Sequence, residues 1–104
     1  ELKMITADFA ILPVGTEDTE CKEYVTAAVQ AIKDSGLNYQ LTGMGTQIEA
    51  ENLKELYEAI ANAQEAVFKT GIGRVYTVIK VDDRHDLENR TLDAKIDTVN
   101  KMLK

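Results

Sequence analysis

The chain has 104 residues, which suits one domain (residues 1–104), because a chain of about this size buries roughly two thirds of its unfolded surface. Its formal net charge of −6 argues against nucleic acid as the main partner, since phosphate recognition relies on clustered Lys and Arg, and favours a cationic small molecule. No apolar segment is long enough to cross a bilayer, and residues 3–12 lack the cleavage pattern of a signal peptide. Cys21 is the only cysteine, so no disulfide is expected, and a cytoplasmic location without a membrane partner is predicted.

A strand and a helix are predicted first. Residues 4–12 alternate in hydrophobicity and predict a central strand, whose ladder Pro13 should block because it has no N–H to donate. Asp18 or Thr19 is expected to cap a helix that runs to about Ser35. The residues of this helix expected to face the core are Cys21, Val25, Ala28 and Ile32.

Residues 37–49 predict a hairpin of two alternating strands that meet at a Gly-Met-Gly turn. We expect Gly43 and Gly45 to adopt positive φ and to let the backbone approach a neighbour or a ligand, with the hydroxyls of Thr42 and Thr46 on either side. This pattern indicates a contact surface, and an ordinary tight turn with exposed threonines is the alternative.

A second helix, a fourth strand and a third helix follow. Asn52 and Glu55 form a capping-box pattern at the start of the second helix, which Gly71 and Gly73 should end, and residues 74–82 alternate as a strand. The second helix is expected to bury Leu53, Leu56, Ile60, Ala63 and Val67. The third helix carries an apolar stripe of Leu92, Ile96, Val99 and Leu103.

The predicted order is strand, helix, strand, strand, helix, strand, which is typical of the α+β class and of the ferredoxin-like βαββαβ sandwich. Right-handed crossovers give an antiparallel sheet of order 4-1-3-2 with two helices on one face. The C-terminal helix is extra to this fold, so we expect it at the sheet edge or against another subunit.

The face of the sheet opposite these helices mixes apolar and polar side chains, too apolar for bare solvent and too polar for a core. Its predicted members are Thr6, Asp8, Ala10, Leu12, Asn38, Gln40, Gln47, Glu49, Tyr76, Val78 and Lys80. Stacking of two such faces predicts a homodimer or a dimer of dimers, with clefts where loops meet. Asp8 should lie near Lys80 and Glu49, either in a cross-strand ion pair or as a carboxylate that attracts a cation in a cleft.

Signatures of catalysis are weak. No phosphate-binding glycine loop follows a strand, and the sequence offers no nucleophile with a base. His85 is the only histidine and lies in the acidic stretch 82–86, where a solvated loop is favoured over a metal site. Asp82 and Asp83 are adjacent at a strand end and should point in opposite directions. We therefore expect no enzyme activity, no metal and no cofactor.

Four pieces of sequence, in this order, resemble one known family. They are residues 9–15 (Phe-Ala-Ile-Leu-Pro-Val-Gly), residues 39–49 with their Leu-Thr-Gly-Met-Gly-Thr core, residues 65–68 (Glu-Ala-Val-Phe) and residues 74–86. They are similar to the small YkoF-like thiamine-binding proteins, formerly a domain of unknown function. The resemblance implies a ferredoxin-like subunit that forms a homodimer or homotetramer through its sheets. It also implies binding of thiamine, or its hydroxymethylpyrimidine part, without transforming it.

The resemblance implies a set of ligand-binding residues. A cationic thiazolium suits Asp8 or Glu49, and flat rings suit Met44 or Tyr76. Hydroxyls and glycine amides of the turn suit the aminopyrimidine. The full set expected to bind ligand is Asp8, Thr42, Gly43, Met44, Gly45, Thr46, Glu49, Tyr76, Thr77, Asp82 and Arg84. The predicted role is a carrier or sensor. The alternatives are an oligomeric structural or regulatory module without a thiamine ligand and, ranked last, an enzyme of thiamine metabolism.

Overall fold

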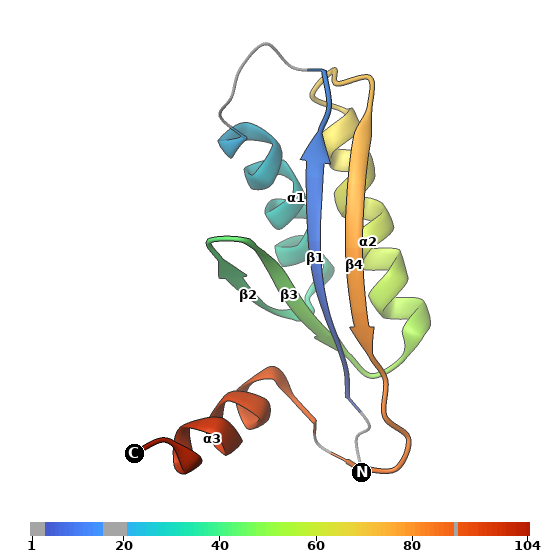
Figure 1. The fold of residues 1–104 in the computed structure, drawn as a ribbon. Helices are drawn as coiled ribbons and strands as arrows, with labels where there is room; N and C mark the ends of the chain where they lie inside the picture. The colour runs from blue at the N-terminus through green and yellow to red at the C-terminus, as the bar shows by residue number, and fades with distance from the viewer. Residues whose placement is uncertain (1–3, 16–20, 89) are drawn as a thin grey trace.

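A computed structural model describes residues 4–15, 21–88 and 90–104. Its elements are β1 (Ile5–Pro13), α1 (Lys22–Ser35), β2 (Asn38–Thr42), β3 (Gly45–Ala50), α2 (Leu53–Phe68), β4 (Val75–Asp82) and α3 (Leu92–Met102). The antiparallel sheet has the order β2-β3-β1-β4, which is the predicted 4-1-3-2 order read from the other edge. The helices α1 and α2 lie together on one face of the sheet, and α3 begins at the opposite face (Figure 1). The predicted ferredoxin-like fold is confirmed.

The core lies between the sheet and the pair α1 and α2. Alternate residues of β1 point into it, and Ile32, Leu56 and Val67 from the helices are fully buried there. The complete buried apolar set is Ile5, Ala7, Phe9, Ile11, Ala28, Ile32, Ile48, Ala50, Leu56, Ala59, Ile60, Ala63 and Val67. The period of two in the strands and the helical spacing in α1 and α2 explain why these residues share one layer.

Three predicted core positions are wrong. Cys21 is exposed, and Val25 is 39% exposed, because the first turns of α1 lie beside a pocket instead of against the sheet. Leu53, the first residue of α2, is 41% exposed. The buried stripe of α2 includes Ala59 instead.

The helix ends follow local sequence signals. Gly36 ends α1 with a left-handed backbone, φ 81°, and the Asn52 side chain accepts a hydrogen bond of 2.9 Å from the Glu55 N–H, as the capping pattern predicts. Cys21 precedes α1 without a side-chain cap; the predicted capping residues, Asp18 and Thr19, lie outside the described residues.

The expectation that Pro13 blocks the ladder is wrong, because Pro13 still pairs with Val75 of β4. The next residue explains this: the Val14 N–H donates to the Arg74 carbonyl at 2.9 Å. In an antiparallel strand, successive residues direct their backbone groups to opposite sides. Pro13 therefore faces away from β4, on the side where its missing N–H costs no hydrogen bond to that strand.

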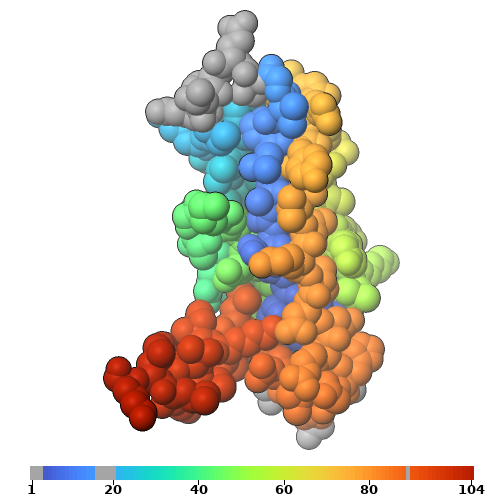
Figure 2. Space-filling view, viewed as in Figure 1, coloured from blue at the N-terminus to red at the C-terminus, as the bar shows by residue number. Residues whose placement is uncertain are grey.

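The third helix forms as predicted, and Thr91 caps it by accepting from the Ala94 N–H at 3.0 Å. Only its start lies against the sheet; the remainder projects away from the body of the molecule (Figures 1 and 2). Ile96, Val99 and Leu103 of the predicted stripe are 45%, 56% and 68% exposed. Among the described helices, none has the length and hydropathy needed to cross a membrane.

Candidate functional site

A pocket of about 280 Å³ lies where β1 continues beyond the end of β3. We call it the hairpin pocket, because the β2–β3 turn forms one wall and the start of α1 forms another. It is lined by Phe9, Ala10, Ile11, Leu12, Cys21, Val25, Ala28, Leu41, Thr42, Gly43, Met44, Gly45 and Thr46. The structure thus brings all five turn residues predicted from the sequence, 42 to 46, into one mostly apolar pocket.

The turn itself differs from the prediction. Neither Gly43 nor Gly45 has a positive φ, so the expectation of left-handed glycines is wrong. Thr42 pairs with Gly45 in the ladder, and the Thr42 hydroxyl donates to the Gly45 carbonyl at 2.9 Å. These contacts close a tight connection through Gly43 and Met44.

Gly45 is required for a close approach to β1. A Cβ at this position would lie 2.9 Å from Oδ1 of Asp8 and 3.1 Å from the Phe9 carbonyl oxygen, whereas a Cβ at Gly43 would meet nothing within 4 Å. The sequence predicted that the turn glycines approach a neighbour or a ligand, and the neighbour at Gly45 is strand β1. The missing side chain at Gly45 leaves room for the Asp8 carboxylate, which lies on the face of the sheet opposite the hairpin pocket.

The threonines flanking the turn differ in burial. Thr42 is exposed, whereas Thr46 faces the helices and is 5% exposed. The Thr46 hydroxyl lines the pocket and has no hydrogen-bond partner among the described residues. Met44, at the tip, is 92% exposed. The pocket thus combines the hydroxyl of a buried threonine with a long apolar side chain at its entrance.

A second pocket, of about 380 Å³, lies on the opposite face between the sheet and the start of α3. Asp8, Lys80, Asp82 and Lys95 give it two charges of each sign. The predicted pair across β1 and β4 is confirmed, since Nζ of Lys80 lies 3.5 Å from Oδ2 of Asp8. Both side chains keep contact with solvent, so the pair contributes little to stability.

Glu49 has a role that the sequence did not reveal. It is 6% exposed, and its two carboxylate oxygens accept hydrogen bonds of 2.8 Å from the Asn38 side-chain amide and from the backbone N–H of Leu92. Leu92 is the first residue of α3, so the carboxylate satisfies a free N–H at the positive end of the helix dipole. Both oxygens of the Glu49 carboxylate are thus hydrogen-bonded within the chain.

Lys95 makes the second attachment of α3. Its ammonium donates to the Thr6 hydroxyl at 2.6 Å and to the Asp82 carboxylate at 2.5 Å. The hydrogen bond from Lys95 lowers the pKa of Asp82 below its ordinary value of 3.8. A third contact joins the Gln40 amide to the Asp93 carboxylate at 2.8 Å. Sequence patterns did not indicate this role of Lys95, because the residue lies in α3 and its partners lie in the strands β1 and β4.

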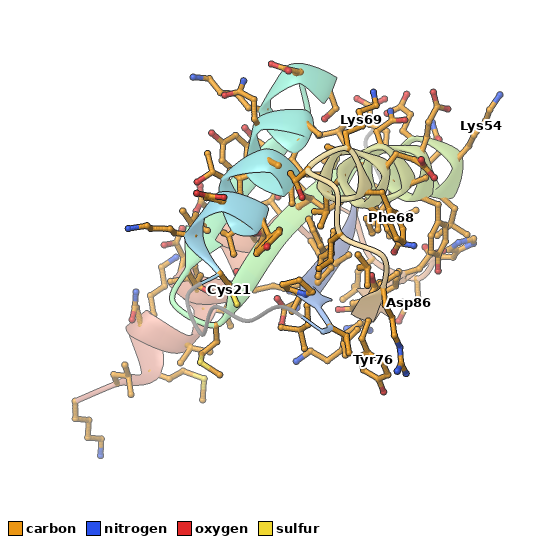
Figure 3. All side chains as sticks on the ribbon, turned by 90° about the horizontal axis from the view of Figure 1, so that it is seen from above. Cys21, Lys54, Phe68, Lys69, Tyr76 and Asp86 are labelled. Carbon is orange, nitrogen blue, oxygen red and sulfur yellow. The ribbon has the colours of Figure 1, made fainter. Side chains whose placement is uncertain are left out.

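The remaining predicted residues lie apart from both pockets. Tyr76 is 57% exposed and extends away from α1 and α2 (Figure 3). Thr77 points to the helices and donates to Gln64 at 2.6 Å. Arg84 forms hydrogen bonds of 3.0 and 2.6 Å with Asp86, which lower the pKa of that carboxyl.

The acidic loop contains a local contact between His85 and Asp83. Nε2 of His85 lies 3.1 Å from Oδ1 of Asp83. Within the described part of the chain, His, Cys, Asp and Glu side chains do not form a group of three that could hold a metal ion.

Comparisons with known proteins identify the family. The profile of a family described as "Thiamine-binding protein" matches residues 7–100. A UPF0045 protein of Methanothermobacter thermautotrophicus is 46% identical over 100 residues, covering 96% of this chain and 100% of that protein. The UPF0045 protein YqgV of Bacillus subtilis is 44% identical over 105 residues, covering 96% and 98% of the two chains.

Solved structures agree. A hypothetical protein of Methanocaldococcus jannascii matches with a TM-score of 0.84 and 28% identity, covering 96% of this chain and 99% of that one. A Thermotoga maritima protein, described as a candidate thiamine biosynthesis/salvage protein, shares the fold with a TM-score of 0.77 at 18% identity, covering 92% and 98%. The chain therefore belongs to the thiamine-binding protein family, and its closely similar relatives are UPF0045 proteins.

Proposed function

We propose that this protein binds thiamine or its hydroxymethylpyrimidine part in the hairpin pocket, without transforming it, and serves as a carrier or sensor. The observation that carries the proposal is the convergence of residues 42 to 46, β1 and α1 on one pocket of about 280 Å³. This volume is at the small end for ligand pockets and suits a single aromatic ring. The family and the thiamine-related description of the Thermotoga maritima neighbour support the same ligand class.

The chemistry of the lining fits such a ligand. Apolar side chains dominate the walls, with the Thr46 hydroxyl as a buried polar group. A flat heteroaromatic ring gains from burial against such walls, and its nitrogens need a small number of placed hydrogen bonds. The Asp8 carboxylate lies next to Gly45 but belongs to the second pocket, on the opposite face of the sheet, where Lys80 pairs with it.

The binding unit is proposed to be a homodimer or homotetramer formed through the open face of the sheet. Leu12, Tyr76 and Val78 on this face are 46%, 57% and 46% exposed, and the apolar stripe of α3 is also uncovered, at the other end of β1 and β4. Covering a few hundred Å² of such surface contributes several kcal/mol at about 25 cal/mol per Å² before the cost of association.

Calorimetry tests the ligand. Purified protein at about 100 μM should bind thiamine or hydroxymethylpyrimidine with a measurable heat, since micromolar affinity corresponds to about 8 kcal/mol. Val25→Trp should abolish binding by filling the pocket from α1. Leu53→Trp is the matched control, because Leu53 is 41% exposed, close to the 39% of Val25, and lies outside the pocket lining. No heat with either ligand would contradict the proposal.

A structural or regulatory oligomer without a thiamine ligand is the second candidate, and the exposed apolar side chains of the open face favour it. Light scattering separates the two functions. Val78→Lys should reduce the particle to one chain, whereas Tyr57→Lys on α2, 47% exposed against 46% for Val78, should leave the assembly intact. Assembly by a wild-type protein that binds neither ligand would favour the second candidate. If the wild-type protein were a single-chain particle at high concentration, the oligomer assumed by both candidate functions would be contradicted.

A further inference from the structure

The hairpin pocket contains an open backbone edge. Strand β3 pairs with β1 only from Ile5 to Phe9, whereas β4 pairs with β1 as far as Pro13. The hairpin therefore ends well short of the end of β1, as Figure 1 shows. Beyond Phe9, one side of β1 has no neighbouring strand among the described residues, and the pocket occupies this place.

The register identifies which backbone groups face the pocket. The Val14 N–H donates to the Arg74 carbonyl, and the register of β1 and β4 is unbroken. The backbone N–H and C=O groups of the even-numbered residues of β1 therefore point toward β4. The N–H and C=O of Ile11 accordingly point to the other side. Ile11 lines the pocket and is 7% exposed, so a donor and an acceptor lie side by side in a shielded position.

These groups need a partner. An unpaired backbone N–H or C=O that is shielded from water is costly, and nearly all such groups in proteins are hydrogen-bonded. The hydroxyl of Thr46, a residue that is 5% exposed, adds a third polar group to the lining of the same pocket.

We propose that the hairpin pocket recognises the amino edge of an aminopyrimidine through the backbone of Ile11. The Ile11 N–H donates to a ring nitrogen, the Ile11 C=O accepts from the adjacent exocyclic amino group, and the Thr46 hydroxyl bonds a further polar atom of the ligand. A ring nitrogen next to an amino group presents an acceptor and a donor side by side, as the backbone of a neighbouring strand does. This inference rests on the proposed function and assigns specificity to the pyrimidine half of the ligand.

Ligand analogues test the hydrogen-bond pattern. Hydroxymethylpyrimidine should bind at least about tenfold more tightly than the same ring without its amino group, because the analogue leaves the Ile11 carbonyl unpaired. The isolated thiazole alcohol should not compete. Equal affinity for the amino and des-amino rings would overturn the inference and leave the proposed function standing. Failure of every pyrimidine and of thiamine to bind would overturn both.

Backbone measurements locate the contact. Hydrogen exchange of the Ile11 amide should slow at least about tenfold when hydroxymethylpyrimidine is added and should not change with the thiazole alcohol. Replacing the Ile11 amide by an ester removes only the N–H and should weaken binding about tenfold. Ligand binding with unchanged Ile11 exchange, or with full affinity in the ester, would overturn the inference.

A side-chain comparison adds an independent readout. Thr46→Val keeps the shape and removes the unpartnered hydroxyl, so it should weaken pyrimidine binding by about tenfold. Thr98→Val removes a hydroxyl that donates to the Ala94 carbonyl on α3 at 2.9 Å and should leave the affinity unchanged. An unaltered affinity in Thr46→Val would remove the threonine from the proposed contact set.

Discussion

Glu49→Ala is expected to detach α3 from the sheet and to lower the free energy of unfolding by about 2–4 kcal/mol. The carboxylate is 6% exposed and accepts two hydrogen bonds of 2.8 Å. Hydrogen bonds to a charged group contribute about 1.5–3 kcal/mol each. The sum is discounted because Asn38 is exposed and its amide can bond water after the change. The loss is a large share of the 5–15 kcal/mol typical of a domain.

Glu49→Gln should cost only about 1 kcal/mol. The glutamine oxygen can still accept from the Leu92 N–H, and its amide can donate to Asn38 if that side chain turns its oxygen inward. What disappears is the negative charge at the start of α3, worth about 0.3–1 kcal/mol. Glu51→Ala is the control, since Glu51 is exposed on the same segment and should change stability by less than about 0.5 kcal/mol.

Urea unfolding followed by circular dichroism gives the free energies, because the chain has no tryptophan for fluorescence. Hydrogen exchange of residues 92–102 reports attachment of α3 and should accelerate selectively in Glu49→Ala. If Glu49→Ala matched Glu51→Ala in stability, or left the exchange of α3 unchanged, the assigned role of this carboxylate would be refuted.

Three further expectations concern stability. Gly45→Ala should cost about 1–3 kcal/mol in urea unfolding because its Cβ would lie 2.9 Å from a carboxylate oxygen of β1, while Gly43→Ala, with nothing within 4 Å, should be tolerated; equal effects would contradict the crowding. Asp82 has a pKa lowered by Lys95, so this pair stabilises α3 fully above the ordinary value of 3.8 and less as pH falls through the lowered pKa. The protection factors of the α3 amides, which correct for the intrinsic pH dependence of exchange, should therefore fall in acid, and a profile unchanged by Asp82→Asn would exclude the pair as the cause. Asn52→Ala should lower the melting temperature through loss of about 1 kcal/mol of capping, and an unchanged melting temperature would show that the cap contributes nothing.

Local patterns in the sequence predicted most of the fold. Alternation in residues 4–12 and 74–82 predicted the neighbouring strands β1 and β4, and Gly36 and Asn52 marked helix ends, because a helix cap or a strand period depends on residues close in the chain. The turn at residues 42–46 was also recognisable from its composition. Its backbone geometry was not, since Gly45 is dictated by the proximity of β1 instead of by a positive φ.

Strand length decided the pocket. The pairing of β3 with β1 reaches only Phe9, whereas β1 continues to Pro13 beside β4. This difference follows from the register of three strands, which no single segment encodes. The same arrangement turned Cys21 and Val25 from expected core residues into pocket lining. A sequence period identifies which side chains share a face, but not what lies opposite that face.

The sequence by itself determined the order of the elements, the capping of α2 by Asn52 and the apolar stripe of α3. Each of these depends on residues within about one or two helical turns in the chain. Tertiary structure alone decided that Glu49 receives the N–H of Leu92, 43 residues away, and that Lys95 reaches Thr6, 89 residues away. Such contacts arise only when the sheet has placed distant segments together. Charge and hydroxyl positions along a chain do not specify these pairings in advance.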